Sequence, residues 1–310
     1  MDIAKSQLNI SHLKMISTIA ESETVKEAAE ALFITQPALT NRIREAERRL
    51  NTDLFIRRGR KLVISSAGKR LLHSANKILE ELARCEHDIA RLSDGVEQVI
   101  RIGLPHYASF NWLPNVVAYF HQDSPNTELE ISANAQQLPL SALYNGDIDI
   151  AMISSANKKL SIDETAYDAI FILQDELMAC LSPQHEYGKH KFLTAEDFAS
   201  QTYITNSTVP EKDREYELFF KPKNIIPKKV LQVGFNEAII EFIKANMGLT
   251  IMTKQLIAPY LNKNLIQTTK LGEGGLKIYW HIVYAKKGKI AKPAKALSKI
   301  LKAHSANSQA

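Results

Sequence analysis

Residues 24–50 read TVKEAAEALFITQPALTNRIREAERRL, and this stretch decides the fold of the N-terminal part of the chain. Thr24 is a favourable N-cap and Glu27 follows it at the capping-box spacing, so a helix should begin there. An earlier helix is predicted by apolar residues at helical spacing, namely Leu13, Ile16 and Ala20. The pattern therefore predicts two short helices ahead of a third one.

The third helix should start near residue 36, because Thr35 or Gln36 can cap it and Pro37 suits a first helical turn. Its apolar face comprises Leu39, Ile43, Ala46 and Leu50. The opposite face is polar and carries Gln36, Thr40, Asn41, Arg44 and Arg48. Asn and Gln can pair with adenine edges, Thr can touch a thymine methyl, and Arg can reach guanine or phosphate. The face suits a reader of the DNA major groove, although an ordinary solvated helix surface has a similar composition.

A short basic segment follows the third helix. Four of the five residues at 57–61 are basic, namely Arg57, Arg58, Arg60 and Lys61. Gly59 permits a tight turn between them. A basic hairpin beside a three-helix unit is a wing that can hold backbone phosphate or the minor groove. A solvated run of charge is the alternative, but the combination of wing and polar helix face favours DNA binding.

The composition narrows the class of protein. The 310 residues carry a formal net charge of +5 and are 45% hydrophobic, so the chain should fold into two or three compact units. Cys85 and Cys180 lie far apart without metal-ligand spacing, which argues against a disulfide scaffold or a metal site. The N-terminus lacks the apolar core of a signal peptide, and no apolar run is long enough to span a membrane. We therefore expect a cytoplasmic protein that needs no metal or other cofactor and contacts no membrane.

Residues 66–93 predict one long helix with an apolar seam. The seam steps alternately by four and three residues, as in a coiled coil: Leu71, Ala75, Ile78, Leu82, Cys85, Ile89 and Leu92. A seam of this length needs a partner, which a parallel or antiparallel second copy would supply. Packing of the helix on its own domain is the alternative. In a paired helix, Cys85 would be a small packing residue rather than a redox sensor.

The remainder of the chain alternates apolar runs with helical stretches, the pattern of a mostly parallel α/β fold. Strands are predicted at residues 99–104, 128–133, 149–154, 177–181, 203–205, 230–233, 250–253 and 278–284. The expected domains are an all-α winged helix-turn-helix at 1–65, a linker and dimerisation helix at 66–93, and an α/β domain at 97–303.

The N-terminal sequence resembles the LysR-type transcriptional regulators. The resemblance rests on Glu27, Ala28, Ala29, the run LFITQPAL at residues 32–39, Thr40, Ile43, Glu47, Leu50, Leu54, Phe55, Arg57, Arg60, Ala67 and Gly68. It implies that the helix at 66–93 pairs two subunits, and that the α/β part is a two-lobed effector-binding domain similar to periplasmic binding proteins. Lobe I would take residues 97–168 and 268–303, and lobe II residues 169–267.

The resemblance also implies which residues contact DNA. In this family, base edges are contacted by the residues that match Gln36, Pro37, Thr40 and Asn41. The backbone is approached by those that match Thr24, Thr35, Arg42 or Arg44, and Arg57. With Arg58, Arg60 and Lys61 of the wing, these residues make up the expected DNA-binding site.

Ligands of such α/β folds bind at the carboxyl ends of strands, near helix N-termini. The expected effector-binding residues are therefore those that follow the predicted strands: Pro105, His106, Tyr107, Ser109, Asn134, Ser154, Thr205, Asn206, Phe235 and Asn236. Ser109, Asn134 and Asn236 could instead be simple helix caps. His106 is the most informative of the set, because a loop histidine titrates near neutrality and could bind a carboxylate, although it could equally be solvated. Many family members have Ser or Thr around Pro105 and Tyr107, so this ligand should be held differently.

Several stretches are similar to the methionine-biosynthesis branch of the family, whose co-effector is homocysteine. They are Trp112-Leu113, Tyr119-Phe120-His121, FLTAEDFASQT at 192–202 and KLGEG at 270–274. The resemblance implies homocysteine, or another small amino acid or acid, as the co-effector of a regulator of sulfur amino acid metabolism. The other expected partners are double-stranded operator DNA and further copies of the chain in a homodimer and homotetramer, with RNA polymerase as an additional candidate.

Two other classes of function fit less well. The first is an enzyme that carries a DNA-binding domain. The sequence contains no G-x-S-x-G, phosphate-binding glycine loop, H-E-x-x-H or paired-Cys motif, so no catalytic residue is expected. An architectural DNA-binding protein without a ligand would rarely carry so long an α/β domain.

Overall fold

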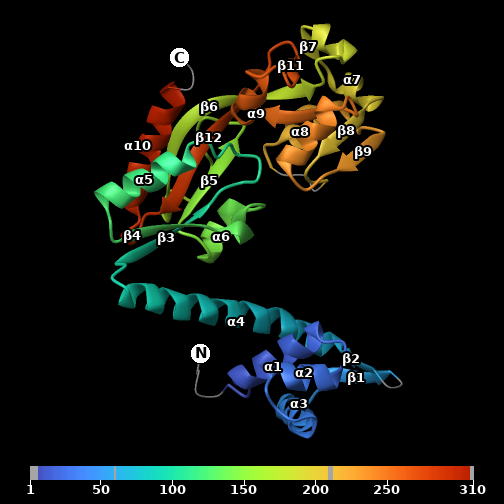
Figure 1. Ribbon diagram of the computed structural model, residues 1–310, viewed down its shortest axis with the longest axis vertical. Coiled ribbons are helices and arrows are strands. Elements are labelled where there is room, and N and C mark those ends of the chain that lie inside the picture. The colour runs from blue at the N-terminus through green and yellow to red at the C-terminus, as the bar shows by residue number, and fades with distance from the viewer. Residues whose placement is uncertain (1–5, 59–60, 209–211, 308–310) are drawn as a thin grey trace. The chain divides into compact units, whose positions relative to one another are not determined.

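The chain folds into two compact units, Met1–Gly95 and Val96–Ala310. The computed structural model of the protein describes residues 6–58, 61–208 and 212–307, with side chains at all of these except 57, 58, 61 and 304–307. Figure 1 shows the helical first unit, which includes the long helix α4 (Ser66–Ser93), and the α/β unit that follows it.

Three helices form the core of the first unit: α1 (Ile10–Glu21), α2 (Val25–Ala31) and α3 (Gln36–Leu50). The Thr24 hydroxyl accepts a hydrogen bond from the N–H of Glu27, and the Thr35 hydroxyl accepts one from Ala38, so the predicted starts of α2 and α3 are confirmed. The apolar face of α3 is buried through Leu39, Ile43 and Ala46. In the turn between α2 and α3, Phe33 is exposed and has a φ of 56°, a conformation that is costly for a bulky residue.

The wing is an antiparallel hairpin of β1 (Phe55–Arg58) and β2 (Lys61–Ile64). Its start is fixed to α3, because the Glu47 carboxylate accepts hydrogen bonds from the N–H groups of Leu54 and Phe55 at 2.9 and 3.1 Å. The predicted turn residues Gly59 and Arg60 lie outside the described residues.

Helix α4 spans the range that its periodicity predicts, with Ser65 as N-cap. The start of its seam packs on the N-terminal unit, where Ala75 is fully buried and Leu71 contacts the core. Further along, the seam is open in the single chain: Ile78, Cys85, Ile89 and Leu92 are all exposed. Packing of the helix on its own domain therefore holds for the start of the seam, and the rest of the seam is uncovered in the single chain.

A mixed eight-stranded sheet runs through the second unit, in the order β4-β3-β5-β12-β6-β11-β7, with β10 also paired to β6. Strand β3 (Gln98–Gly103) lies between β4 (Thr127–Ile131) and β5 (Ile150–Ser155) and is parallel to both. Strand β12 (Leu276–Ala285) is antiparallel to its neighbours β5 and β6 (Tyr167–Leu181). The expectation of a mostly parallel sheet is therefore wrong, because the chain returns through β12 in the opposite direction.

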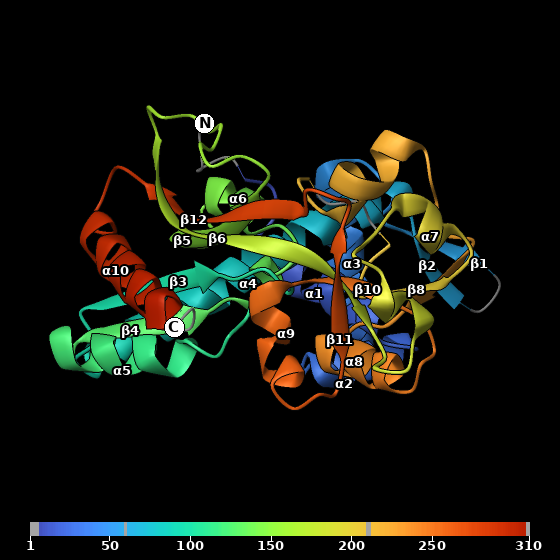
Figure 2. The same cartoon turned by 90° about the horizontal axis from the view of Figure 1, so that it is seen from above.

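Helices cover both faces of this part of the sheet. Figures 1 and 2 show α5 (Leu113–Asp123) and α10 (Ala291–Asn307) side by side on one face and α6 (Pro139–Asn145) on the other. Along β5, Ile150 and Met152 belong to the core beneath α5 and α10, whereas the alternating Ala151 and Ile153 belong to the core beneath α6.

A second lobe is built at the far end of β6. It comprises β7 (Phe192–Leu193), α7 (Ala195–Ala199), β8 (Thr202–Thr205), β9 (Lys229–Gln232), α8 (Asn236–Lys244), β10 (Thr250–Thr253), α9 (Lys254–Leu261) and β11 (Gln267–Leu271). Strands β10 and β11 pair with the C-terminal end of β6, and β8 and β9 form a separate parallel pair. Strand β6 begins ten residues before the predicted 177–181 and crosses the expected lobe boundary at 168/169. Its first part carries Asp168, which breaks the apolar pattern but accepts a hydrogen bond from the Tyr284 hydroxyl at 3.2 Å.

Candidate DNA-binding surface and effector cleft

The polar face of α3 is open to solvent. Gln36, Pro37, Asn41 and Arg44 are exposed, and Thr40 and Arg42 are half-buried. The Thr40 hydroxyl donates to the carbonyl of Gln36 at 3.0 Å, which leaves its methyl group available to a partner. Residues 42 and 44 lie about 200° apart around the helix axis, so they lie on opposite sides of α3.

Two threonines cap the helices that lead into this face. Thr24 and Thr35 are both exposed, at the N-termini of α2 and α3. Each uses its hydroxyl oxygen as an acceptor for the helix backbone, which leaves the hydroxyl proton able to donate to a phosphate. In the wing, Arg57 and Arg58 lie in β1 and Lys61 in β2, while Arg60 falls outside the described residues.

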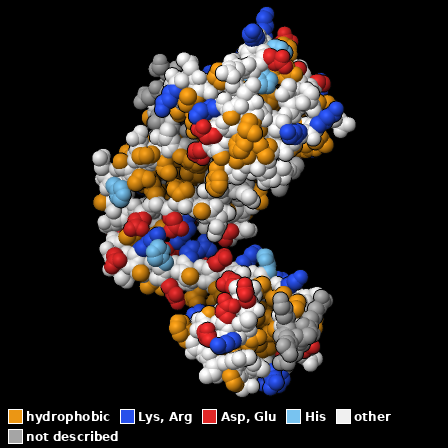
Figure 3. Space-filling view, turned by 45° about the vertical axis from the view of Figure 1, so that its right-hand side comes forward, with side chains coloured by type: hydrophobic (Ala, Val, Ile, Leu, Met, Phe, Trp, Pro, Cys, Tyr) orange, Lys and Arg blue, Asp and Glu red, His pale blue; other side chains and the backbone are white. Residues whose placement is uncertain are grey.

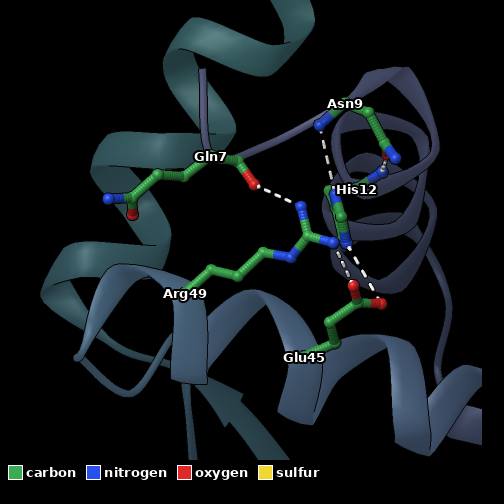
Figure 4. Close-up of polar contacts among 5 residues, drawn as sticks. All are labelled: Gln7, Asn9, His12, Glu45 and Arg49. Carbon is green, nitrogen blue, oxygen red and sulfur yellow. Dashed lines mark hydrogen bonds and ion pairs between the residues drawn. The ribbon is translucent and has the colours of Figure 1, made fainter. Parts of the chain in front are cut away.

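A polar network around the buried His12 joins α3 to the start of α1 (Figure 4). The imidazole of His12, 2% exposed, accepts a hydrogen bond from the Asn9 N–H at Nδ1 and faces the Glu45 carboxylate with Nε2, at 3.8 Å. Glu45 is also paired with Arg49, which donates to the carbonyl of Gln7 at 3.0 Å. Burial lowers the pKa of His12, so this imidazole is neutral near pH 7. The network fixes the helix that presents the polar face.

The cleft between the lobes is crossed by a chain of hydrogen bonds. The Asn236 amide, at the start of α8, donates to the carbonyl of His106 in the first lobe at 2.6 Å. Asn206, just after β8, donates in turn to the Asn236 side-chain oxygen at 3.2 Å. Three of the predicted effector residues therefore lie together, although they are far apart in the sequence.

A second set of contacts across the cleft comes from the segment after β8. Arg214 is buried, with its guanidinium carbon 3.7 Å from the centroid of the Tyr107 ring and Nη2 3.1 Å from a Glu215 carboxylate oxygen. The neighbouring Asp213 accepts a hydrogen bond from the Ser155 hydroxyl at 3.2 Å. Tyr107 is held from the other side by the Ser154 hydroxyl, which donates to its oxygen at 3.4 Å. A short segment of the second lobe is thus anchored on the first.

Two cavities open beside these contacts. The larger, of about 330 Å³, is lined by His106, Tyr203, Thr205, Asn206, Ser207, Thr208, Arg214, Glu215, Tyr216, Phe220, Ile226, Pro227 and Val230. The smaller, of about 210 Å³, lies on the first lobe and includes Tyr107, Ser154, Ser155, Lys212 and Asp213 in its lining. The volume of the larger cavity, with its few polar groups, is typical of small-molecule sites.

The interior of the larger cavity disfavours charge on its titratable groups. Burial, and then the charge of Arg214, lowers the pKa of His106, so this imidazole is neutral near pH 7. Burial also raises the pKa of the Tyr203 hydroxyl well above its usual range. The formal charges at this end of the cleft are therefore those of Arg214 and Glu215.

The predicted effector residues divide into two groups. His106, Tyr107, Ser154, Thr205 and Asn206 line one or other of the two cavities, and Asn236 joins them through hydrogen bonds. The other four predicted residues are described by the structure but line neither of these two cavities: Pro105, Ser109, Asn134 and Phe235. Sequence reasoning missed Arg214 and Glu215, because the run EKDREYE at 211–217 has the composition of a solvated turn. It also missed Phe220, which lines the larger cavity.

Other kinds of site find no support in the described residues. No group of three or more His, Cys, Asp or Glu side chains in the described ranges is placed to hold a metal ion. Among the helices described, none is both long and apolar enough to cross a membrane.

A winged helix-turn-helix with an open polar face, in a chain that also has a two-lobed α/β unit with a ligand-sized cleft, defines a ligand-responsive DNA-binding regulator. A family model described as "LysR substrate binding domain" matches residues 93–306, and one described as "Bacterial regulatory helix-turn-helix protein, lysR family" matches residues 10–69. The chain therefore belongs to the LysR family of transcriptional regulators.

Relatives in this family match most of the chain. The HTH-type transcriptional regulator MetR of Haemophilus influenzae is 26% identical over 269 residues, covering 87% of this chain and 85% of that protein. MetR of Escherichia coli is 24% identical over 278 residues, covering 90% of this chain and 84% of that protein. These relatives are transcriptional regulators, in agreement with the expected function.

Solved structures share the fold. The regulatory domain of MetR from N. meningitidis has a TM-score of 0.58 at 21% identity and covers 66% of this chain and 93% of that one. Full-length CbnR in complex with its target DNA has a TM-score of 0.67 at 18% identity and covers 96% of this chain and 100% of that one. The expected architecture, a helix-turn-helix domain with a two-lobed α/β regulatory domain, is confirmed.

Proposed function

We propose that the protein is a dimeric LysR-type regulator whose hold on operator DNA is set by a small co-effector bound between the two lobes. The observation that carries the proposal is the pair of cross-lobe contacts, Asn236 to His106 and Arg214 to Tyr107, beside a ligand-sized cavity. A ligand that binds one arrangement of the lobes better than another shifts the population toward it. The regulatory unit would thereby control how the DNA-binding units are presented.

On DNA, we assign base contacts to Gln36, Pro37, Thr40 and Asn41 and backbone contacts to the threonine caps and basic residues. The backbone set is Thr24, Thr35, Arg42, Arg44, Arg57, Arg58, Arg60 and Lys61. The exposure of the α3 face and the free hydroxyl protons of the caps support this division. Base contacts carry sequence preference, whereas phosphate contacts carry affinity and salt dependence.

Pairing of two α4 helices would bury the open part of the seam. Ile89, which is 57% exposed in the single chain, would then contact its partner, and Cys85 would become a packing residue. A dimer would present two recognition helices to successive major grooves. Hydrophobic side chains also gather in patches on the second unit (Figure 3), which offers further surface for assembly into a homotetramer.

The MetR relatives and the sequence resemblance support a role in sulfur amino acid metabolism, with homocysteine or another small amino acid or acid as co-effector. RNA polymerase is the natural partner of a regulator bound near a promoter. Because the chromosome is its target, the protein would act in the cytoplasm. As a regulator, it would bind its co-effector without chemical turnover.

The test is selection of bound genomic fragments by the full-length protein, followed by footprinting with and without homocysteine and other candidate metabolites. We expect two protected half-sites separated by about 10–10.5 base pairs or a multiple of this, with a co-effector-dependent extent. A footprint that no metabolite alters, together with a melting temperature that none raises, would instead favour an architectural protein.

Dimerisation is tested by Ile89→Asp, which places a charge in the seam. We expect a monomer in sedimentation and loss of the paired half-site footprint. Glu86→Ala, on the same helix but off the seam, should leave both unchanged. A fully dimeric Ile89→Asp protein would contradict pairing through α4.

A further inference from the structure

We propose that the larger cavity receives an α-amino acid with a bulky apolar side chain, whose charged head group lies at Arg214 and Glu215. The inference rests on the proposed function, because it names the co-effector class for the same cleft. It departs from the homocysteine expected from the sequence, because the cavity favours a larger and more apolar side chain. The observation behind it is that this cavity joins one ion pair to an apolar wall.

The charged end of the cavity is electrically balanced. Arg214 and Glu215 approach to 3.1 Å, and their side chains are only 7% and 18% exposed. A bare carboxylate ligand would add negative charge beside Glu215, and a bare amine would add positive charge beside Arg214. Either would be costly away from water. A zwitterion adds no net charge, and its two charges lie side by side, as those of the pair do.

Polar groups around the pair can complete the hydrogen bonds of such a head group. Thr205, the last residue of β8, and Asn206 and Ser207 after it line the same cavity. His106 reaches it from the first lobe, and as a neutral imidazole it adds hydrogen-bonding capacity without charge. The head group would therefore lie at the boundary of the lobes, where Asn236 already bonds to the His106 carbonyl.

The rest of the lining includes an apolar wall. The rings of Tyr203 and Phe220 are 5.4 Å apart and almost fully buried, and the Tyr203 hydroxyl donates to Glu215 at 3.4 Å. At the mouth of the cavity, Ile226 is 70% exposed and Val230 is 43% exposed. When an apolar ligand group covers large aliphatic side chains that are open to water, the removal of their surface from water contributes favourable free energy of binding.

The size of the cavity sets an upper limit on the ligand. Its volume of about 330 Å³ is close to the lower end of the roughly 300–1,000 Å³ of ligand pockets. This space suits a single amino acid rather than a peptide or a dinucleotide. An alanine-sized side chain would leave the wall of Phe220, Ile226 and Val230 uncovered.

The ligand class is tested by calorimetric titration of the full-length protein with leucine, methionine, alanine and homocysteine. The series includes 4-methylpentanoate and 3-methylbutylamine, which are leucine without its amine and without its carboxylate. We expect leucine and methionine to bind about tenfold or more tightly than alanine and homocysteine. Each leucine analogue should bind about tenfold more weakly than leucine. Equal binding of alanine, equal binding of either analogue, or no amino acid binding would overturn the proposal.

Glu215→Gln tests the head group, because it removes the negative charge while keeping a side chain of the same shape. We expect leucine to lose about tenfold in affinity and 4-methylpentanoate to gain, so that the preference between them inverts. A merely structural role for Glu215 would weaken both ligands together, and that result would overturn the assignment of the head group.

Ile226→Asn tests the apolar wall and should weaken leucine while leaving alanine unchanged. Met247→Asn is the matched control, because Met247 is 54% exposed on the same lobe and does not line the cavity. If Ile226→Asn altered the sedimenting mass but not leucine binding, the mouth of the cavity would serve subunit contacts. The assignment of the ligand side chain to this apolar wall would then be wrong.

Footprinting separates this inference from the proposed function. A footprint that responds to a different class of metabolite, with no amino acid bound, would overturn the inference and leave co-effector control intact. Leucine binding without any effect on DNA protection would support the site and overturn co-effector control.

Discussion

The guanidinium carbon of Arg214 lies 3.7 Å from the centroid of the Tyr107 ring, and this contact joins the second lobe to the first. Tyr107 is fixed in turn by Ser154 and by Trp280, whose ring centroid is 5.7 Å away. Because Arg214 also pairs with Glu215 in the wall of the larger cavity, one side chain takes part in both lobe contact and ligand site. A ligand that moves Arg214 would therefore change how the lobes are held.

We expect Arg214→Ala to destabilise the second unit by about 3 kcal/mol, because it removes a cation–π contact and leaves the largely buried Glu215 carboxylate without its cation. Both tryptophans of the chain, Trp112 and Trp280, lie in this unit, so urea unfolding followed by tryptophan fluorescence reports on it alone. Lys159→Ala, at an exposed ion pair with Glu164, should change the unfolding free energy by less than about 0.5 kcal/mol. Identical midpoints for Arg214→Ala and the parent protein would show that the contact contributes no stability.

The elements that were predictable from the sequence are those specified locally. The threonine caps at residues 24 and 35 and the 3.6-residue periodicity of α3 and α4 fix helix starts and faces through nearest neighbours alone. Strand β6 was predicted too short, because Asp168, an exposed residue that hydrogen-bonds to Tyr284, distant in sequence, breaks the apolar pattern of its first part.

The effector cleft was predictable only in part, for a related reason. His106, Asn206 and Asn236 follow strand ends, and the carboxyl ends of strands are where ligands bind. Arg214 and Glu215 stand in a charged run that resembles any solvated turn, and Arg214 is buried in contact with Tyr107, which is distant in sequence. Long-range packing of this kind leaves no local pattern in a single sequence.

Gly68, in the first turn of α4, allows a close approach of the wing. A Cβ atom there would lie 2.2 Å from the carbonyl oxygen of Leu54 and 2.6 Å from Cγ1 of Ile64. We expect Gly68→Ala to destabilise the first unit by about 1–3 kcal/mol, an effect of overpacking. Circular dichroism should show an earlier loss of helix while the tryptophan transition stays in place.

Gly234→Ala is the control for this substitution, because a Cβ there meets nothing within 4 Å. Helix propensity alone predicts the opposite sign at residue 68, a gain of up to about 1 kcal/mol for alanine. A stabilised Gly68→Ala protein would therefore show that the wing can yield at this contact.

His12 should make the first unit sensitive to mild acid. Burial lowers its pKa in the folded state below the ordinary value of 6.5. The unfolded state then binds the proton more readily, so stability is complete above about pH 6.5 and is lost as the pH falls toward the folded pKa. The circular dichroism transition of the first unit should shift to lower urea between pH 7 and pH 5.

His12→Gln should flatten this pH dependence, because glutamine at the same helix position can still accept the Asn9 N–H in a capping box but does not titrate. His106, whose pKa is also lowered by burial, lies in the second unit and is followed separately by tryptophan fluorescence. An unchanged pH profile in His12→Gln would assign the acid sensitivity of the first unit to other groups.

Gln36 and Arg57 should have separable effects on DNA binding. Gln36 is exposed at the start of α3, where an amide can make paired hydrogen bonds to adenine, so Gln36→Ala should cost about 1–3 kcal/mol of discrimination between operator and mismatched DNA. Arg57 lies in β1 of the wing, and a phosphate contact there predicts that Arg57→Ala weakens binding to all sequences alike. The slope of log affinity against log salt should also fall by about 1. Anisotropy titrations on the selected operator and on random duplexes, at several salt concentrations, measure both quantities. If both substitutions weakened operator and random DNA equally, the assignment of base contact to Gln36 would be wrong.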